Sequence, residues 1–217
     1  MNKNAVIITG GTIKDEFVLS QIKKTEDPYL IGVDRGVSFL YRNHLSPDYI
    51  VGDFDSLSEE IVEFYKNDTK VPIREFNPIK DYSDTEIAVR LAIEKGCKSI
   101  KLLGATGTRL DHVLANIQIL TIPHKEGIYA EILDEHNKIY LIEKEKKIVK
   151  NEMYGPYFSV FPLGGCVEHF SIEGAAYPLT DHTLTPYNSL CVSNQAKEDQ
   201  VTITFPKGIV ILMETKE

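Results

Sequence analysis

The sequence is poor in cysteine, and the three residues present do not suit a disulfide framework or a structural zinc site. Cys97, Cys166 and Cys191 are odd in number and form no CxxC pair, so we expect reduced thiols and a cytoplasmic protein. The chain also lacks an apolar run of membrane-spanning length, and the strand-like residues 5–8 come too early for a secretory leader. We therefore expect neither secretion nor a membrane partner.

Positive charge is scarce as well. The chain has 24 Lys and Arg against 32 Asp and Glu, a net charge of −8. Because phosphate backbones are bound mainly through excess Lys and Arg, no nucleic-acid partner is expected. A small anionic ligand would need a metal ion or local hydrogen-bond donors. With 217 residues, 42% of them hydrophobic, the chain can bury a core in one large or two small domains.

The first half alternates short apolar runs with helix-like stretches, which is typical of parallel βαβ units. The expected strands are 5–9, 29–33, 49–51, 71–75, 100–103 and two runs within 130–142. The expected helices are 36–43, 58–67, 83–95 and 109–120. The helix at 83–95 has the clearest signals, because Ser83-Asp84-Thr85-Glu86 is a capping-box pattern and Gly96 follows as a stop.

The second half changes to short apolar runs separated by Gly, Pro and Asn, which favours an antiparallel sandwich. The expected strands are 157–161, 166–172, 176–179, 189–193, 201–205 and 209–213. We therefore expect an α/β domain with a mainly parallel sheet at 1–143, followed by an all-β antiparallel sandwich domain at 144–217. We place the boundary within about ten residues of Glu143.

Acidic residues recur where the expected strands of the first half end. Asp34 follows one strand, Asp53 and Asp55 follow the next, and Asp81 and Asp84 precede a helix. The carboxyl ends of parallel strands share one edge of a sheet, so these side chains are expected to face one cleft. Two carboxylates about 5 Å apart repel by roughly 3 kcal/mol at an effective dielectric constant of about 20. A cluster of them therefore favours Mg²⁺, which also holds phosphates.

A purely structural role competes with that interpretation. Asp84 falls in the first turn of a helix, where acids interact favourably with the macrodipole, and Ser56-x-x-Glu59 is another capping-box pattern. A turn with two acids is common, so the residues alone leave both alternatives open.

A second candidate is the loop from Gly104 to His112, directly after an expected strand. Gly104 and Gly107 allow close approach of the backbone to a phosphate, and Arg109 adds a charged fork. A plain turn with Thr108-x-x-Asp111 as a cap is an equal alternative, since the loop has no Walker Lys and no full GxGxxG. His112 suits general acid–base chemistry or packing, and Gly10-Gly11 suits nucleotide binding or a tight turn.

Four segments together resemble the thiamine pyrophosphokinase family over nearly the whole chain. They are GDFDS at 52–56, KDYSDTE at 80–86, GATGTRLDH at 104–112 and SNQ at 193–195. The resemblance implies Mg²⁺-dependent transfer of the pyrophosphate group from ATP to thiamine, giving thiamine diphosphate and AMP. It also implies a homodimer with thiamine near the subunit interface.

The resemblance also implies roles for particular residues. Those implied to hold Mg²⁺ and the ATP phosphates are Asp34, Asp53, Asp55 and Asp84, with Lys80 and Asp81 beside them. Those implied to lie by the nucleotide are Gly104, Gly107 and Arg109. We also expect Gly10, Gly11 and Thr106 to bind the nucleotide. Those implied to shape the thiamine side are Asp111, His112, Ser193 and Asn194. Asp53, Asp55, Asp84 and Arg109 are the expected catalytic residues.

The chain departs from the family pattern at two positions. Ser83 replaces the usual Thr and keeps its hydroxyl, whereas Thr108 stands where the family commonly has a second Gly before the Arg. Two other functions remain open: pyrophosphate transfer to another alcohol such as a hydroxymethylpterin, and a non-catalytic ligand-binding homologue. The Ser193-Asn194 segment favours thiamine, and the intact acids favour catalysis.

Overall fold

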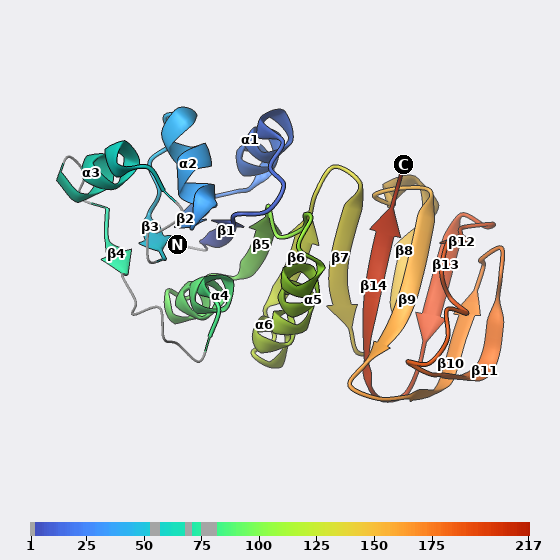
Figure 1. Cartoon of the computed structure of the whole chain (residues 1–217). Helices are drawn as coiled ribbons and strands as arrows, with labels where there is room; N and C mark the ends of the chain where they lie inside the picture. Colours follow the sequence, from blue (N-terminus) through green and yellow to red (C-terminus); the bar gives the residue numbers. More distant parts are fainter. Residues whose placement is uncertain (1–2, 53–56, 68–70, 75–81) are drawn as a thin grey trace. The chain divides into compact units, whose positions relative to one another are not determined.

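A computed structural model describes residues 3–52, 57–67, 71–74 and 82–217, without the side chain of Arg74 (Figure 1). The chain divides into two compact units, Met1–Glu135 and His136–Glu217. The division lies ahead of Glu143, the boundary expected from the sequence, because residues 137–142 form a strand that pairs with residues 209–215 of the second unit. Among the described residues, no helix has the length and apolar character needed to cross a bilayer.

The first unit is a parallel sheet with helices on both faces (Figure 1). Its strands are β1 (Asn4–Ile8), β2 (Pro28–Val33), β3 (Tyr49–Val51), β4 (Ile73–Arg74), β5 (Ser99–Leu103) and β6 (Tyr129–Leu133). They lie in the order β6-β5-β1-β2-β3-β4, and every neighbouring pair is parallel. The α/β fold expected for this half is therefore confirmed.

The helices of the first unit connect consecutive strands. They are α1 (Asp15–Lys24), α2 (Arg35–Arg42), α3 (Glu59–Asn67), α4 (Asp84–Glu94), α5 (Leu110–Ile119) and α6 (Thr121–Lys125). In α4, the Ser83 hydroxyl accepts a hydrogen bond from the Glu86 amide at 3.2 Å, and Gly96 follows with φ +74°. The expected N-cap and stop are thus present, whereas the Glu86 carboxylate contacts Arg90 instead of completing the capping box. The sequence did not predict α1 or α6.

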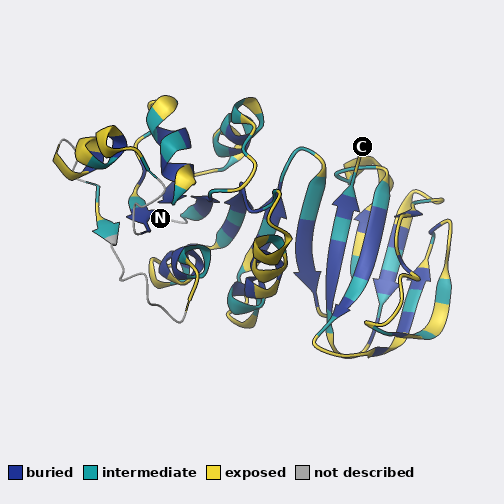
Figure 2. Ribbon diagram, viewed as in Figure 1, coloured by how far each residue is buried: buried dark blue, intermediate teal, exposed yellow. Residues whose placement is uncertain are grey.

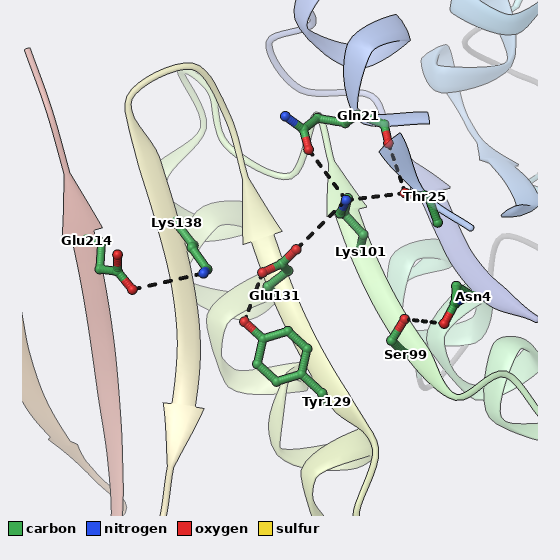
Figure 3. A network of polar contacts seen from close by, with 9 residues as sticks. All are labelled: Asn4, Gln21, Thr25, Ser99, Lys101, Tyr129, Glu131, Lys138 and Glu214. Atoms are coloured by element: carbon green, nitrogen blue, oxygen red, sulfur yellow. Dashed lines mark hydrogen bonds and ion pairs between the residues drawn. The ribbon is translucent and has the colours of Figure 1, made fainter. Parts of the chain in front are cut away.

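A polar network lies at the amino ends of β1, β5 and β6 (Figure 3). The Lys101 ammonium lies 3.4 Å from Gln21 Oε1 and 3.2 Å from Thr25 Oγ1, both at the end of α1. It also lies 4.0 Å from Glu131, whose carboxylate accepts from the Tyr129 hydroxyl at 2.9 Å. A cavity of about 200 Å³ beside these groups is lined by the network itself. The contacts therefore fasten α1 to the sheet.

The second unit consists of two antiparallel sheets packed on a shared core (Figure 2). Its elements are β7 (Asn137–Ile142), β8 (Lys146–Val149), η1 (Lys150–Glu152), β9 (Tyr157–Leu163), β10 (Val167–Glu173), β11 (Leu179–Leu184), β12 (Asn194–Gln195), β13 (Gln200–Thr204) and β14 (Ile209–Thr215). One sheet has the order β12-β9-β14-β7 and the other β11-β10-β13-β8. Apolar residues that alternate along the strands, among them Phe158, Phe170 and Val201, are fully buried between the sheets. The expected all-β sandwich is confirmed.

Two strand predictions in this unit were wrong. Residues 189–193 form a turn ahead of β12, and residues 176–178 form the approach to β11. The alternating apolar residues of the first segment suggested a strand, but Leu190 and Val192 are about half exposed. Only the Cys191 carbonyl there accepts a bond from β9, from the Val160 amide at 3.1 Å, so no ladder forms.

Candidate functional site

The main cleft of the first unit lies where the strand order reverses. From β1 the chain proceeds outward through β2, β3 and β4, and then returns to β5 on the other side of β1. Open α/β sheets bind ligands at such a point, outside the carboxyl ends of the strands. The cleft has a volume of about 470 Å³. Its lining residues are Thr9, Gly10, Gly11, Thr12, Asp34, Arg35, Asp84, Thr85, Gly104, Ala105, Thr106, Gly107, Thr108, Arg109, His112, Val113 and Asn116.

Two backbone loops, one after β1 and one after β5, are hydrogen-bonded along the base of the cleft. The Gly11 amide donates to the Gly104 carbonyl and the Thr12 amide to the Thr106 carbonyl, each at 2.8 Å. A Cβ on Gly11 would lie 2.2 Å from the Thr106 oxygen, so the close approach requires glycine. Gly104, with φ +66°, adopts a left-handed conformation that costs other residues energy. These loops therefore form a fixed backbone surface.

Two side chains hold the second loop in place. Asn116 of α5, only 6% exposed, donates from its amide to the Ala105 carbonyl at 2.8 Å. The Thr106 hydroxyl donates to Asp134 at 2.7 Å, just after β6. Because a buried amide without a partner costs about 1–3 kcal/mol, these bonds resist displacement of the loop.

Acidic groups also line the cleft. Asp34, at the N-terminus of α2, adopts φ +48°, which is uncommon for a residue other than glycine. A Cβ on Gly52 would lie 2.9 Å from Asp34 Oδ1, so this carboxylate points at the backbone immediately before Asp53. Asp84, at the start of α4, lines the same cleft. The structure thus gathers Asp34 and Asp84 from distant parts of the chain.

Arg109 supplies positive charge at the cleft. Its guanidinium forms a two-pronged contact with Asp111, with Nε to Oδ1 at 3.2 Å and Nη2 to Oδ2 at 2.5 Å. The hydrogen bond from Arg109 lowers the pKa of Asp111 to about 2, and the same bond raises the pKa of Arg109. The two side chains are 70% and 64% exposed, so water screens the pair and its net strength is small. Arg109 can therefore exchange Asp111 for a phosphate.

Most residues predicted for the nucleotide side lie in this cleft. Those that line it are Gly10, Gly11, Asp34, Asp84, Gly104, Thr106, Gly107 and Arg109. His112, which was predicted for the thiamine side, lines the same cleft. Asp111 reaches it only through Arg109. The competing Thr108 cap does not form, because Arg109 is the N-cap of α5 and no side chain caps that helix. Asp53, Asp55, Lys80 and Asp81 lie outside the described residues.

The sequence did not single out several lining residues. They are Thr9, Thr12, Arg35, Thr85, Val113 and Asn116. The threonines flank glycines or follow Asp84, and Arg35 directly follows Asp34, so each adjoined a position already under consideration. Their neighbours carried the recognisable pattern, and only the fold shows that they face the cleft.

The available donors suit a hard cation. Within the described ranges, no group of three His, Cys, Asp or Glu side chains is arranged to hold a metal ion. Asp34 and Asp84 are carboxylates, and Asp53 directly follows the glycine that the Asp34 carboxylate faces. Oxygen donors of this type fit Mg²⁺ and do not suit a thiolate-binding metal.

The second unit holds Ser193 and Asn194, the residues predicted for the thiamine side. Asn194 is 2% exposed, accepts from the Tyr177 and Gln195 amides at 3.0 and 2.9 Å, and donates to the Tyr177 carbonyl at 2.8 Å. Its side chain therefore clamps the backbone of Tyr177, whose ring is 69% exposed. Ser193 has φ +56°, and its amide donates to Ser159 Oγ at 3.0 Å. The Ser193 side chain stays exposed beside that clamp.

Comparison with known proteins matches both units. Residues 21–132 match the model of the thiamin pyrophosphokinase catalytic domain, and residues 143–210 match that of the thiamin pyrophosphokinase vitamin B1 binding domain. The thiamine pyrophosphokinase of Bacillus subtilis is 30% identical over 188 residues, covering 86% of this chain and 87% of that protein.

Solved structures agree. The thiamine pyrophosphokinase structure from Bacillus subtilis superposes with a TM-score of 0.85 at 30% identity, covering 99% of both chains. The thiamin pyrophosphokinase structure from Geobacillus thermodenitrificans superposes with a TM-score of 0.83 at 29% identity, covering 98% of this chain and 97% of that chain. With its two-unit fold, the glycine-lined cleft and both domain matches, the chain belongs to the thiamine pyrophosphokinase family.

Proposed function

We propose that this protein transfers the pyrophosphate group of ATP to thiamine, giving thiamine diphosphate and AMP. The observation that carries the proposal is the cleft at the strand-order reversal. There, two glycine loops bonded to each other form the base, and Arg109, Asp34 and Asp84 line the same space. Backbone N–H groups, an arginine and carboxylates are the groups needed to hold a metal-bound polyphosphate. The family match supplies the acceptor.

In this reaction the hydroxyl oxygen of thiamine attacks the β-phosphorus of ATP. The bond from that phosphorus to the oxygen bridging to the α-phosphorus breaks, AMP leaves with the electron pair, and the hydroxyl proton is released. Because little covalent help is needed, catalysis consists of in-line positioning and charge neutralisation. Arg109 is positioned to neutralise phosphate oxygens, and the glycine loops to fix the chain of phosphates. The sequence does not require a dedicated base.

The carboxylates have a different task. We assign Asp34, Asp53, Asp55 and Asp84 to Mg²⁺, with Lys80 and Asp81 beside them. Asp34, Asp53 and Asp55 follow the ends of the neighbouring strands β2 and β3, and Asp84 lines the same cleft as Asp34. Bound Mg²⁺ would neutralise phosphate charge and orient the β-phosphorus. In its absence the same acids would repel ATP.

The thiamine side is assigned to the second unit. Asn194 fixes the backbone of Tyr177, whose exposed side chain is available to meet a cationic heterocycle by a cation–π contact. The exposed Ser193 hydroxyl can hydrogen-bond the same ligand. We also propose a homodimer, supported by the exposed apolar side chains Tyr187, Leu190 and Val192 close in sequence to Ser193. Free cysteines suit a cytoplasmic enzyme.

The direct test is incubation of purified protein with thiamine, ATP and MgCl₂, with nucleotides and thiamine esters separated by chromatography. AMP and thiamine diphosphate should appear together and stop when EDTA removes the metal. ADP with thiamine monophosphate as first products would contradict pyrophosphate transfer. Preferential use of a hydroxymethylpterin would mean that the acceptor is this alcohol and not thiamine. An absence of turnover with any alcohol would indicate a non-catalytic homologue.

Variants test the acidic residues. Asp53→Asn and Asp55→Asn each keep the side-chain shape and remove one charge, so each should abolish most turnover without loss of fold. Asp27→Asn is the matched control, because Asp27 precedes β2 at the opposite edge of the sheet. Near-native turnover of both cleft variants at limiting Mg²⁺ would mean that the pair is only a turn.

A further inference from the structure

Arg35 is a cleft residue with no assigned task. It is the first residue of α2, directly after Asp34, and it lines the cleft. Its side chain is exposed, and within residues 3–52, 57–67, 71–74 and 82–217 no hydrogen bond or ion pair involves its guanidinium. In a chain of net charge −8, an arginine that meets no carboxylate is unusual enough to require an explanation.

The other described arginine side chains all pair with acids. Arg42, at the far end of the same helix, forms a two-pronged contact with Asp15. Arg90 contacts Glu86 at 2.8 Å, and Arg109 contacts Asp111. These pairs satisfy their guanidinium groups inside the protein, whereas Arg35 keeps its five N–H donors available to a ligand.

The position of Arg35 complements that of Arg109. Strand β1 lies between β5 and β2. Arg109 lies in the connection after β5 and Arg35 follows β2, so the two residues flank the loop after β1, residues 10–12, from opposite sides. An anion seated on that loop would lie between the two arginines, because both line the cleft and follow the strands on either side of β1.

The backbone that carries Arg35 is held firmly. A Cβ on Gly36 would lie 1.9 Å from the Ile8 carbonyl oxygen, so α2 begins in direct contact with the end of β1. Gly10 is in ordinary van der Waals range of the same helix start, since a Cβ there would be 3.4 Å from the Arg35 amide nitrogen. The N-terminus of α2, with its partial positive charge, is therefore fixed at the same loop.

We propose that Arg35 is a second phosphate-binding arginine, which holds the polyphosphate of ATP together with Arg109 from the two sides of the β1 loop. This inference rests on the proposed function. It predicts a selective role, because only the nucleotide carries phosphates. Loss of Arg35 should weaken the binding of ATP strongly and that of thiamine little. Lysine should restore only part of the binding, because an ammonium lacks the planar fork of donors that matches a phosphate.

The test compares Arg35→Gln and Arg35→Lys with Arg90→Gln, which removes the same charge from an exposed helix position outside the cleft. Binding of ATP with MgCl₂ is measured by calorimetry without thiamine, and KM for both substrates by AMP release. Arg35→Gln should bind ATP roughly ten- to a hundredfold more weakly, with Arg35→Lys between it and wild type. Its thiamine KM and its Tm without ligand should match Arg90→Gln. The dependence of ATP affinity on KCl should also become shallower.

The outcomes separate this inference from the proposed function. AMP formation by the wild type, with ATP affinity of Arg35→Gln within about twofold of Arg90→Gln, would overturn the role of Arg35 alone. Equal losses for ATP and thiamine, or an unchanged salt dependence, would also overturn it, because they indicate a structural effect. A wild type that binds neither ATP nor thiamine would overturn both.

Discussion

Replacing Gly11 with alanine should separate the two loops that form the base of the cleft. The new Cβ would lie 2.2 Å from the Thr106 carbonyl oxygen and 2.4 Å from that of Gly104. Both are backbone atoms, so relief requires a loop displacement of roughly 1 Å to approach van der Waals separation. The bonds donated by Gly11 and Thr12, now 2.8 Å long, would lengthen with it.

The size of the effect follows from these contacts. Overpacking costs about 1–3 kcal/mol, and two weakened hydrogen bonds add about 1 kcal/mol each, a total of about 3–5 kcal/mol. For a chain of this length, the Tm of the first unit should fall by roughly 6–20 °C. Nucleotide affinity should fall as well, because the phosphate-facing backbone moves.

Gly10→Ala is the matched control. The same Cβ added one residue earlier meets its nearest atoms at 3.4 to 3.6 Å, which is ordinary contact. Its Tm should change by less than about 2 °C, or rise slightly because alanine restricts the unfolded chain. Thermal unfolding of both variants, followed by circular dichroism, decides the matter. Equal Tm values for the two would refute the close-packed arrangement of the loops.

Three further outcomes follow from single contacts. Ser83→Ala should lower stability by about 1 kcal/mol, measured by urea denaturation, because the Glu86 amide loses its cap, while Ser83→Thr should stay near wild type. Arg42 lowers the pKa of Asp15 to about 2, below its usual value. That pair therefore stabilises the fold above pH about 4 and loses its effect as pH falls towards 2. The Tm difference between wild type and Asp15→Asn should shrink over that range. Asn194→Ala breaks three backbone contacts of a buried amide, so it should raise the thiamine KM far more than the ATP KM, and mixed dimers with Asp53→Asn should regain activity if sites are shared between subunits. Equal KM effects would place Asn194 outside the thiamine site.

Local signals predicted the elements whose stability is local. A cap at Ser83, an apolar face and a terminal glycine predict helix α4, and the structure has all three. Helix α1 was missed because only Val18 and Gln21 of its ten residues are buried, too narrow an apolar stripe to recognise. Residues 189–193 alternate like a strand, but whether a partner strand lies beside them is a tertiary property.

The site divides in the same way. Acids and glycines at strand ends were predictable, because parallel strands bring their carboxyl ends to one edge. The hydrogen bond between Gly11 and Gly104 exists because β5 lies beside β1, where the strand order reverses. No single segment of the sequence predicts that order. Asn194 illustrates the converse. Its polar amide suggested a ligand contact, yet three bonds to neighbouring backbone occupy it, so we propose that it acts on thiamine binding only through Tyr177.

An acidic protein that binds ATP needs local positive charge to offset its repulsion of the phosphates. Asp34 and Asp84 lie in the same cleft as Arg35 and Arg109, so both signs of charge line a space of about 470 Å³. On the proposed function, the acids repel a bare triphosphate and attract one that carries Mg²⁺, whereas the arginines attract either. ATP and metal must then strengthen each other's binding by the same factor, since coupling between two ligands is reciprocal. The acids thereby select the metal-bound nucleotide, and the arginines fix where its phosphates lie.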